Sequence, residues 1–145
     1  MNWKAEAMEK LSRYDAMRQA KANLPAEIQR LEAAAYSLRG KDMEQAPVRN
    51  RGNRPEDQLL SNLVLRQELM AAMEQADAWL RITDRALSAL TPEEKLILHR
   101  LYIYPERGSV ERLCGELNVE QSSVYRKRDK ALRKFTCALY GISEN

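Results

Sequence analysis

Apolar and small residues recur mostly at intervals of three or four along two long stretches of the chain. In the first stretch they are Trp3, Ala7, Leu11, Tyr14, Met17, Leu24, Ile28, Leu31, Ala35 and Leu38. In the second they are Leu69, Met73, Ala76, Leu80, Thr83, Leu87 and Leu90. Because an α-helix turns once every 3.6 residues, this spacing puts each set on one face of a helix. Only five glycines and five prolines interrupt the chain, which favours an all-α protein.

Two features divide the first part of the chain. Pro25 interrupts the first stripe, and we expect either a kink or a break with Pro25 in the first turn of a second helix. Residues 39–54 lose the periodicity and contain two glycines, a proline and two asparagines, so we predict a basic loop there. Pro55, Glu56 and Asp57 then suit the start of a helix, since acids favour the positive end of its dipole.

The second long helix needs a partner, because an apolar stripe roughly 50 Å long cannot be buried against a small domain alone. The first stripe is the natural partner, so we expect a long N-terminal antiparallel hairpin that resembles a coiled coil. Further apolar residues are left for self-association, which makes a homo-oligomer through this hairpin our expectation. They are Leu59, Leu60, Leu63, Val64 and Trp79.

The last part of the chain reads as several short helices. Thr91 to Glu94 is a capping box with a proline at the first helical position, and this helix should end before Pro105. Ser109 is a candidate cap for the next helix, in which Cys114 and Gly115 are small enough for a close helix crossing. Asn118 can adopt the left-handed conformation of a tight turn. The last helix should then run over about 121–138, and its inward face should carry Val124, Arg128, Ala131, Leu132 and Phe135.

Charge is concentrated in this last helix, although the whole chain carries only +3. The cations there are Arg126, Lys127, Arg128, Lys130, Arg133 and Lys134, against the single acid Asp129. Such a local excess predicts an anionic partner. A basic helix can also be no more than a solvated face, and the turn before it is what favours nucleic acid.

The segment from Leu113 to Phe135, LCGELNVEQSSVYRKRDKALRKF, resembles the helix-turn-helix of sigma-factor region four and of the small phage regulators related to it. The stretch LTPEEKLILHRLY from Leu90 is similar to the helix that precedes it in those proteins. The layout of the first half, with APVRNRGNRPEDQLL, is similar to the ArpU/RinA-like late transcription regulators of phages of Gram-positive bacteria. The sequence departs from the usual pattern at Asn118, at Glu120, where a serine cap is usual, and at Lys127.

This resemblance implies a phage or prophage regulator that binds double-stranded DNA and meets host RNA polymerase or its sigma factor. It implies a role in reading base edges in the major groove for Gln121, Ser122 and Arg126. It implies contacts with the DNA backbone for Ser123, Tyr125, Lys127, Arg128, Lys130, Arg133 and Lys134. Arg128 sits at the edge of the inward face and can lie under the helix instead.

Other classes of function find little support. We expect no enzyme and no cofactor, because the chain lacks a phosphate-cradling glycine loop, a Ser/His/Asp arrangement and a metal cluster. Cys114, Cys137 and His99 lack metal-site spacing, which predicts no metal and fits a reducing cytoplasm. No run of residues is apolar and long enough to span a membrane, and no secretion signal is expected at the start.

The sequence therefore predicts two modules, a helical hairpin over residues 1–90 and a helix-turn-helix over residues 91–145. The leading hypothesis is a sequence-specific transcription regulator located in the cytoplasm. One alternative is a small terminase-like subunit of phage DNA packaging, in which a similar module rides on an oligomerising stalk. The other is a protein-binding module that docks on sigma factor or polymerase and never contacts DNA.

Overall fold

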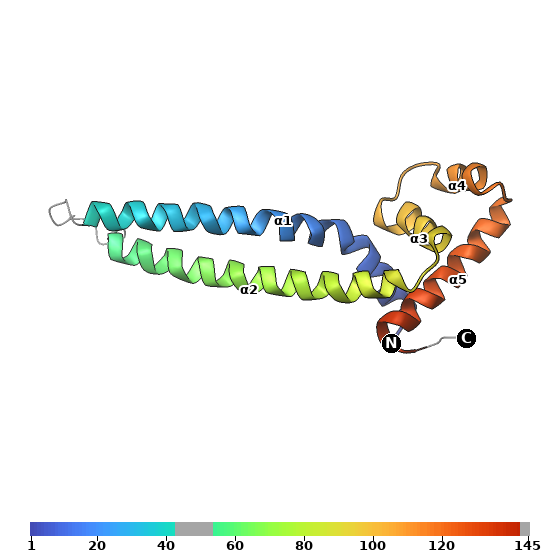
Figure 1. Ribbon diagram of the computed structural model, residues 1–145, viewed down its shortest axis with the longest axis horizontal. Helices are drawn as coiled ribbons and strands as arrows, with labels where there is room; N and C mark the ends of the chain where they lie inside the picture. Colours follow the sequence, from blue (N-terminus) through green and yellow to red (C-terminus); the bar gives the residue numbers. More distant parts are fainter. Residues whose placement is uncertain (43–53, 143–145) are drawn as a thin grey trace. The chain divides into compact units, whose positions relative to one another are not determined.

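The computed structural model describes residues 1–42 and 54–142, and every regular element in these ranges is a helix (Figure 1). In chain order the elements are α1 (Trp3–Asp42), α2 (Pro55–Ser88), α3 (Pro92–Leu98), the π-helical segment η1 (His99–Ile103), α4 (Ser109–Leu117) and α5 (Gln121–Tyr140). The prediction of an all-α protein is therefore confirmed for the described residues.

The connection between the two long helices starts later than predicted. Helix α1 continues through Gly40 to Asp42, so the first residues of the predicted loop are helical. Helix α2 begins at Pro55, as predicted, with Glu56 and Asp57 in its first turn. Residues 43–53, which include Arg49 and Arg51, lie outside the described residues, and the basic loop there stays a prediction.

The contacts within the chain define two compact units. One comprises Gln19–Asp77, and the other joins Met1–Arg18 with Ala78–Asn145. The first turns of α1 and the last turns of α2 thus belong to the same unit as α3, α4 and α5. We describe each unit by itself.

In the unit Gln19–Asp77, segments of α1 and α2 lie side by side (Figure 1). Lys21 of α1 forms a salt bridge with Asp77 of α2 at 2.8 Å. Further along, the Nδ2 atom of Asn62 donates a 2.8 Å hydrogen bond to the backbone carbonyl of Leu31. Since the residue number rises along α1 while that of its partner falls along α2, the two segments run in opposite directions. The buried apolar residues of this unit are Ile28, Leu31, Ala35 and Ala76.

Pro25 lies inside α1 and does not end it. A proline removes one backbone hydrogen bond and crowds the preceding turn, at a cost of about 3 kcal/mol in a helix interior. The apolar spacing continues on both sides, with Leu24 half-buried and Ile28 buried. Burial of this face keeps the helix continuous, so the alternative of two separate helices was wrong.

The main core of the second unit lies where the start of α1 and the end of α2 meet α3, η1 and α5. The buried cluster contains Ala7 and Leu11 of α1, Ala86 of α2, Leu90, Leu98 of α3, Ile103 of η1, and Ala131, Leu132 and Phe135 of α5. Phe135 is the largest side chain with no exposed surface. A second cluster joins α3, α4 and α5 through Ile97, Leu113 and Val124.

Two tyrosine–aspartate hydrogen bonds attach the start of α1 to the rest of this unit. The Tyr14 hydroxyl donates to the carboxylate of Asp84 in α2, and the Tyr104 hydroxyl, just after η1, donates to Asp15. Burial and the neighbouring Asp84 carboxylate raise the pKa of Tyr14 to about 12. Both tyrosines therefore remain protonated donors throughout the physiological pH range.

The helix ends confirm some predictions and correct others. Glu94 N donates to Thr91 Oγ1 at 3.2 Å and Thr91 N donates to Glu94 Oε1 at 3.0 Å, which is the predicted capping box. Helix α4, however, has Gly108 at its N-cap, with φ at 76°, a conformation that costs glycine little. The Ser109 hydroxyl instead bonds back to the backbone of Glu106.

One further expectation for this region was wrong. A Cβ atom added to Gly115 would meet nothing within 4 Å, so no close helix crossing depends on this glycine.

The helical segment that starts at Pro92 ends before Pro105, as predicted. Within it the backbone changes from α at Leu98 to π over His99–Ile103, and no residue pattern in the sequence indicated this change.

Phe135→Ala should destabilise the unit that contains α5, because it leaves a cavity among fully buried neighbours. We expect a loss of about 3 to 5 kcal/mol. Urea unfolding followed by circular dichroism measures the loss, with Tyr36→Ala as the control, because Tyr36 is 81% exposed. Equal midpoints for the two variants would contradict the assigned core.

Candidate nucleic-acid interface on α5

Helix α5 starts from a tight connection after α4. Asn118, at the C-cap of α4, adopts the predicted left-handed conformation, with φ at 54° and ψ at 49°. Val119 N donates to the Cys114 carbonyl at 3.1 Å, and the Val119 side chain packs against the Ile97–Leu113–Val124 cluster. Glu120 stands at the N-cap of α5 with extended backbone, and its side chain makes no capping hydrogen bond. The connection is therefore a tight turn set by backbone conformation, without a side-chain cap on α5.

The core determines which side of α5 faces inward. Four residues of the predicted inward face have at most 1% of their surface exposed. They are Val124, Ala131, Leu132 and Phe135. At 100° per residue these four positions cover one side of the helix. The opposite side of α5 is left for solvent or for a partner.

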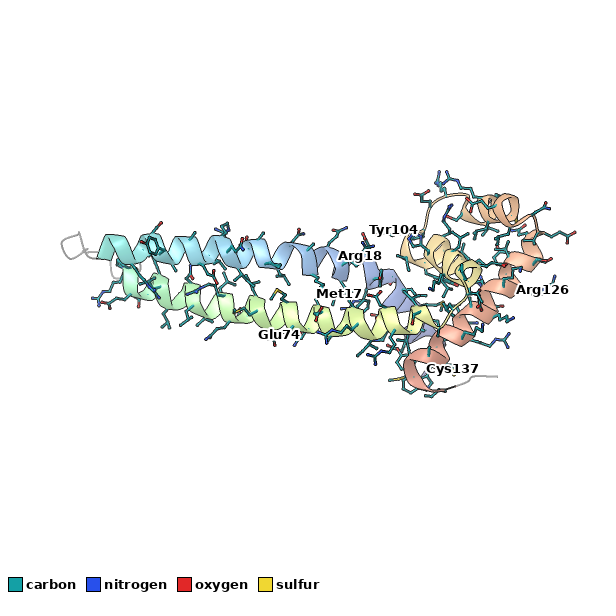
Figure 2. All side chains as sticks on the ribbon, in the orientation of Figure 1. Met17, Arg18, Glu74, Tyr104, Arg126 and Cys137 are labelled. Carbon is teal, nitrogen blue, oxygen red and sulfur yellow. The ribbon has the colours of Figure 1, made fainter. Side chains whose placement is uncertain are left out.

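Three cations occupy this outer side. Arg126, Lys130 and Arg133 are exposed, and they follow one another at intervals of four and three residues. Arg126 donates from Nη2 to the Ser123 hydroxyl at 3.1 Å, and it is labelled on α5 in Figure 2. Within residues 1–42 and 54–142, no acid forms an ion pair with any of the three cations. Their charge remains available to an anionic ligand.

Two other predicted backbone-contacting residues are bound to acids of α3. Lys127 Nζ lies 2.6 Å from Glu93 Oε1, and Lys134 Nζ lies 2.9 Å from Glu94 Oε1. A cavity of about 230 Å³ lies between them, lined by Thr91, Glu93, Glu94, Ile97, Lys127, Lys130 and Lys134. To bind a phosphate, Lys127 would have to leave the carboxylate of Glu93, and Lys134 that of Glu94.

Glu94 is the most buried of these acids, because only 10% of its side chain is exposed. Burial by itself raises its pKa, but hydrogen bonds from Lys134 and from Thr91 outweigh that effect, so the pKa of Glu94 lies below its usual value. Its second oxygen, Oε2, has no hydrogen-bond partner among the described residues. Glu94 thus links the capping box of α3 to the last turns of α5.

A third group of predicted site residues lies near the start of α5. Gln121 Nε2 donates to the Tyr125 hydroxyl at 3.3 Å, and the Arg128 guanidinium lies 4.9 Å from the centre of the Tyr125 ring. Arg128 also donates two hydrogen bonds to Asp129, which pairs with Lys4 of α1 at 3.7 Å. Ser122 is exposed beside them, while Ser123 is half-buried.

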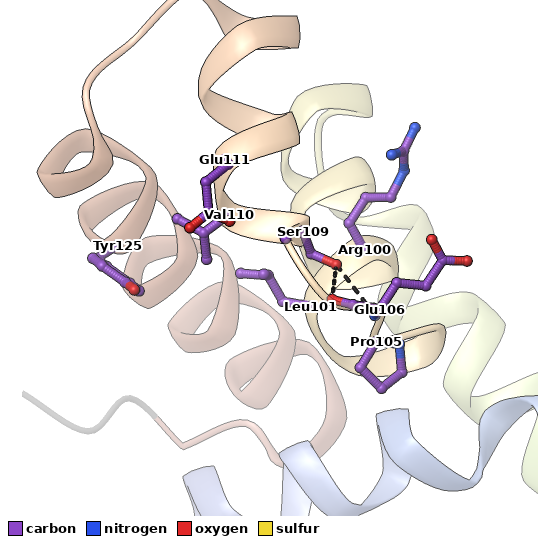
Figure 3. Close-up of a pocket in the computed structure, with 9 residues that line it drawn as sticks. Arg100, Leu101, Pro105, Glu106, Ser109, Val110, Glu111 and Tyr125 are labelled. Atoms are coloured by element: carbon purple, nitrogen blue, oxygen red, sulfur yellow. Dashed lines mark hydrogen bonds between the residues drawn. The ribbon is translucent and has the colours of Figure 1, made fainter.

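Tyr125 also forms one wall of a cavity of about 210 Å³ below the start of α4 (Figure 3). Its other lining residues are Arg100, Leu101, Pro105, Glu106, Gly108, Ser109, Val110 and Glu111. The two Ser109–Glu106 hydrogen bonds close the turn at its edge. Arg100 is held by Glu116 at 3.0 Å and is not available to a ligand in this arrangement.

The structure thus divides the ten predicted site residues by their present partners. The outer side of α5 holds Ser122, Arg126, Lys130 and Arg133. Sequence reasoning missed the two acids, Glu93 and Glu94, that hold Lys127 and Lys134. The signal was present in the capping-box motif, but its contact with α5 depends on the tertiary packing of α3.

No group of three or more His, Cys, Asp or Glu side chains in residues 1–42 and 54–142 is placed to hold a metal ion. None of the helices in the described ranges has both the length and the apolar character that crossing a membrane requires. Cys114 and Cys137 are free thiols.

Comparison of the chain with protein-family models, with curated proteins and with solved structures finds no match. Its function is therefore inferred from its own residues and their arrangement.

The Glu94–Lys134 pair makes stability depend on pH in a defined direction. Because the folded-state pKa of Glu94 is lowered from 4.5, the charged carboxylate stabilises the fold above that pH. This stabilisation should disappear as pH falls through the lower, folded-state pKa. Glu94→Gln, which keeps an oxygen for the Thr91 amide, should cost about 1 to 2 kcal/mol at pH 7 and much less near pH 3.

Urea unfolding of the original chain and of Glu94→Gln at both pH values measures this difference. Glu111→Gln is the matched control, because Glu111 is an exposed acid of the same unit. A difference for Glu94→Gln that does not change with pH would show that the charge of Glu94 is not what stabilises the fold.

Proposed function

We propose that this protein binds double-stranded DNA through the outer side of α5 and acts as a sequence-specific transcription regulator. The observation that carries the proposal is the row Arg126, Lys130 and Arg133, which lacks acidic partners within the described residues, on the side of α5 opposite the core. An α-helix fits the major groove of B-DNA, where side chains reach base edges and phosphates. A rigid basic helix held from behind by packed helices suits that docking.

In this proposal the connection from α4 to α5 acts as the turn of a helix-turn-helix, with residues 91–145 as the DNA-binding module. Arg126 is the best placed side chain to read a base, since arginine can bond to guanine O6 and N7. Gln121 and Ser122 precede it by one turn and complete the base-contacting set. Lys130 and Arg133 contact phosphates, about 6 and 10 Å further along the helix.

Lys127, Lys134 and Arg128 have a weaker role in this proposal than their charge suggests. Each is already paired with a carboxylate, of Glu93, Glu94 and Asp129 respectively. Binding of a phosphate to one of these cations would first break its ion pair with the carboxylate. The net gain in binding free energy is therefore only the difference between the two attractions. Tyr125 and Ser123 remain candidates for hydrogen bonds to the backbone.

The proposed role in transcription and the proposed phage or prophage origin rest on the resemblance of Leu113–Phe135 to sigma-factor region four. It also suggests a cytoplasmic protein that acts beside host RNA polymerase or sigma factor. The antiparallel helices of residues 19–77, as a coiled-coil-like hairpin, would then offer a surface for a partner or for self-association. Exposed Leu60, Leu63 and Val64 support such a surface.

Arg126→Ala should relax the sequence preference at one base pair and weaken binding to the preferred site by about 1 to 3 kcal/mol. Selection of bound DNA from a random pool, followed by anisotropy titrations, measures both quantities. Arg13→Ala is the control, because Arg13 is an exposed cation on α1. An equal loss of affinity for every DNA sequence would contradict base reading by Arg126.

Lys130→Ala with Arg133→Ala should reduce the slope of log K against log salt by about two units, because each phosphate contact releases counterions. Lys134→Ala should change this slope much less, because Lys134 is held by Glu94. Titrations of one DNA site at several salt concentrations give the slopes. If Lys134→Ala has the largest effect, the outer side of α5 is not the DNA-binding face.

Two other functions remain as alternatives to be separated by these measurements. A small terminase-like packaging subunit would assemble into rings in solution, which the mass of the protein and of its DNA complex would reveal. A purely protein-binding module would give no complex with DNA even at low salt and high protein concentration.

A further inference from the structure

Helix α2 carries a row of apolar side chains on the side that faces away from α1. Leu60, Leu63, Val64 and Met70 are 42–61% exposed, and we call these four residues the α2 outer face. At 100° per residue they fall within an arc of about 120°. The residues of α2 that meet α1, such as Asn62 and Ala76, lie on the other side of the helix.

This row is not the ordinary scatter of apolar residues on a protein surface. Ten large hydrophobic residues are exposed in the described chain, and four of them form the α2 outer face, which is interrupted by Gln67. Single exposed apolar residues need no explanation, but several on one side of one helix are typical of a binding surface. Helix-in-groove and helix-on-helix recognition use such rows, with anchors at spacings of three, four and seven.

The charges around the α2 outer face are almost all negative. Within Pro55–Asp77 the acids are Glu56, Asp57, Glu68, Glu74 and Asp77, and the single cation is Arg66. Arg66 is turned toward the inner side, where its Nε donates to Asn62 Oδ1 at 2.8 Å. Asp77 is paired with Lys21, which leaves the other acids around the apolar row. Glu74, which Figure 2 labels on α2, follows Met70 by four residues.

This combination selects among the possible occupants. A second copy would place acids against acids. Antiparallel pairing about residue 65, the middle of the row, places Glu56 opposite Glu74, and parallel pairing places each acid opposite itself. Like charges that flank an apolar seam disfavour pairing. Nucleic acids and anionic membranes are repelled for the same reason. A helix whose apolar stripe is flanked by lysine and arginine complements both the row and its charge.

We propose that the α2 outer face binds an amphipathic helix of another protein, with Leu60, Leu63, Val64 and Met70 as apolar anchors and the surrounding acids as partners for its Lys and Arg residues. This surface lies in the unit Gln19–Asp77 and uses none of the residues assigned to DNA. The protein would thus join an anionic ligand on α5 to a cationic protein segment on α2.

The test uses the full chain and two synthetic helical peptides of about three heptads each. Both carry leucine at the positions of one stripe, and they differ only in having lysine or glutamate beside it. The lysine peptide should bind, with an affinity that falls as salt is added, and the glutamate peptide should not bind at the same concentrations. Equal binding of the two peptides would overturn the proposal, as would no binding of either.

The chain offers a closely matched pair of variants for locating the binding surface. Leu63 is 42% exposed on the α2 outer face, and Leu65 is 41% exposed on another side of the same helix. Leu63→Gln should weaken binding of the lysine peptide about tenfold, and Leu65→Gln should leave it unchanged. Equal effects of both substitutions, or no effect of Leu63→Gln, would overturn the assignment.

Two controls separate this proposal from the others. Sedimentation of the chain alone tests whether the α2 outer face binds a second copy. Self-association that is abolished by Leu63→Gln and preserved by Leu65→Gln would show that it does, and would overturn our proposal. Leu63→Gln should bind DNA as the original chain does. A failure of DNA binding in the original chain would contradict the proposed function without affecting the peptide result.

Discussion

Burial of one side of α5 is the constraint on which the arrangement of the larger unit depends. Phe135, Leu132 and Ala131 pack against the beginning of α1, the end of α2 and α3, so residues from both ends of the chain meet around one helix. Because this side must be shielded from water, the helical period decides which residues of α5 point outward. The outward direction of the exposed cations follows from the burial of their neighbours, and no separate interaction is needed to orient them.

The cations of α5 are divided by their surroundings into two kinds. Those on the outer side, such as Arg126 and Lys130, keep their charge for a partner, while Lys127 and Lys134 are held by the first turn of α3. A count of basic residues therefore overstates the charge that a ligand meets. It also follows that Glu93 and Glu94 have two functions, since acids in a first turn stabilise their own helix as well as the packing of α5.

Local rules in the sequence predicted much of this fold. The capping box at Thr91, the left-handed Asn118 and the inward face of α5 each depend on residues within a few positions of one another, and all three were correct. The apolar stripes were likewise found buried or half-buried. Periodicity is visible in a sequence because each turn of a helix repeats the same requirement.

The remaining features depend on contacts between residues that are distant in the sequence. Tyr14 and Asp84 are 70 residues apart, and Lys4 and Asp129 are farther apart still, so no local pattern indicates such pairs. The pairing of Lys134 with Glu94 was missed for the same reason, which limited the prediction of the site to its helix and its outward direction. The π-helical turn at His99–Ile103 and the N-cap at Gly108 are backbone conformations without a side-chain capping hydrogen bond, so no side-chain motif in the sequence indicates them.

The amide of Asn62 has a consequence for how the two long helices can slide. It is 8% exposed and donates to the backbone carbonyl of Leu31 on the facing helix. Carbonyls of a helix recur in the same direction once per turn, about 5.4 Å, so a slide by part of a turn would leave this buried amide without an acceptor, at a cost of about 1 to 3 kcal/mol. The two facing segments can therefore change register only in steps of whole turns without leaving Asn62 unpaired.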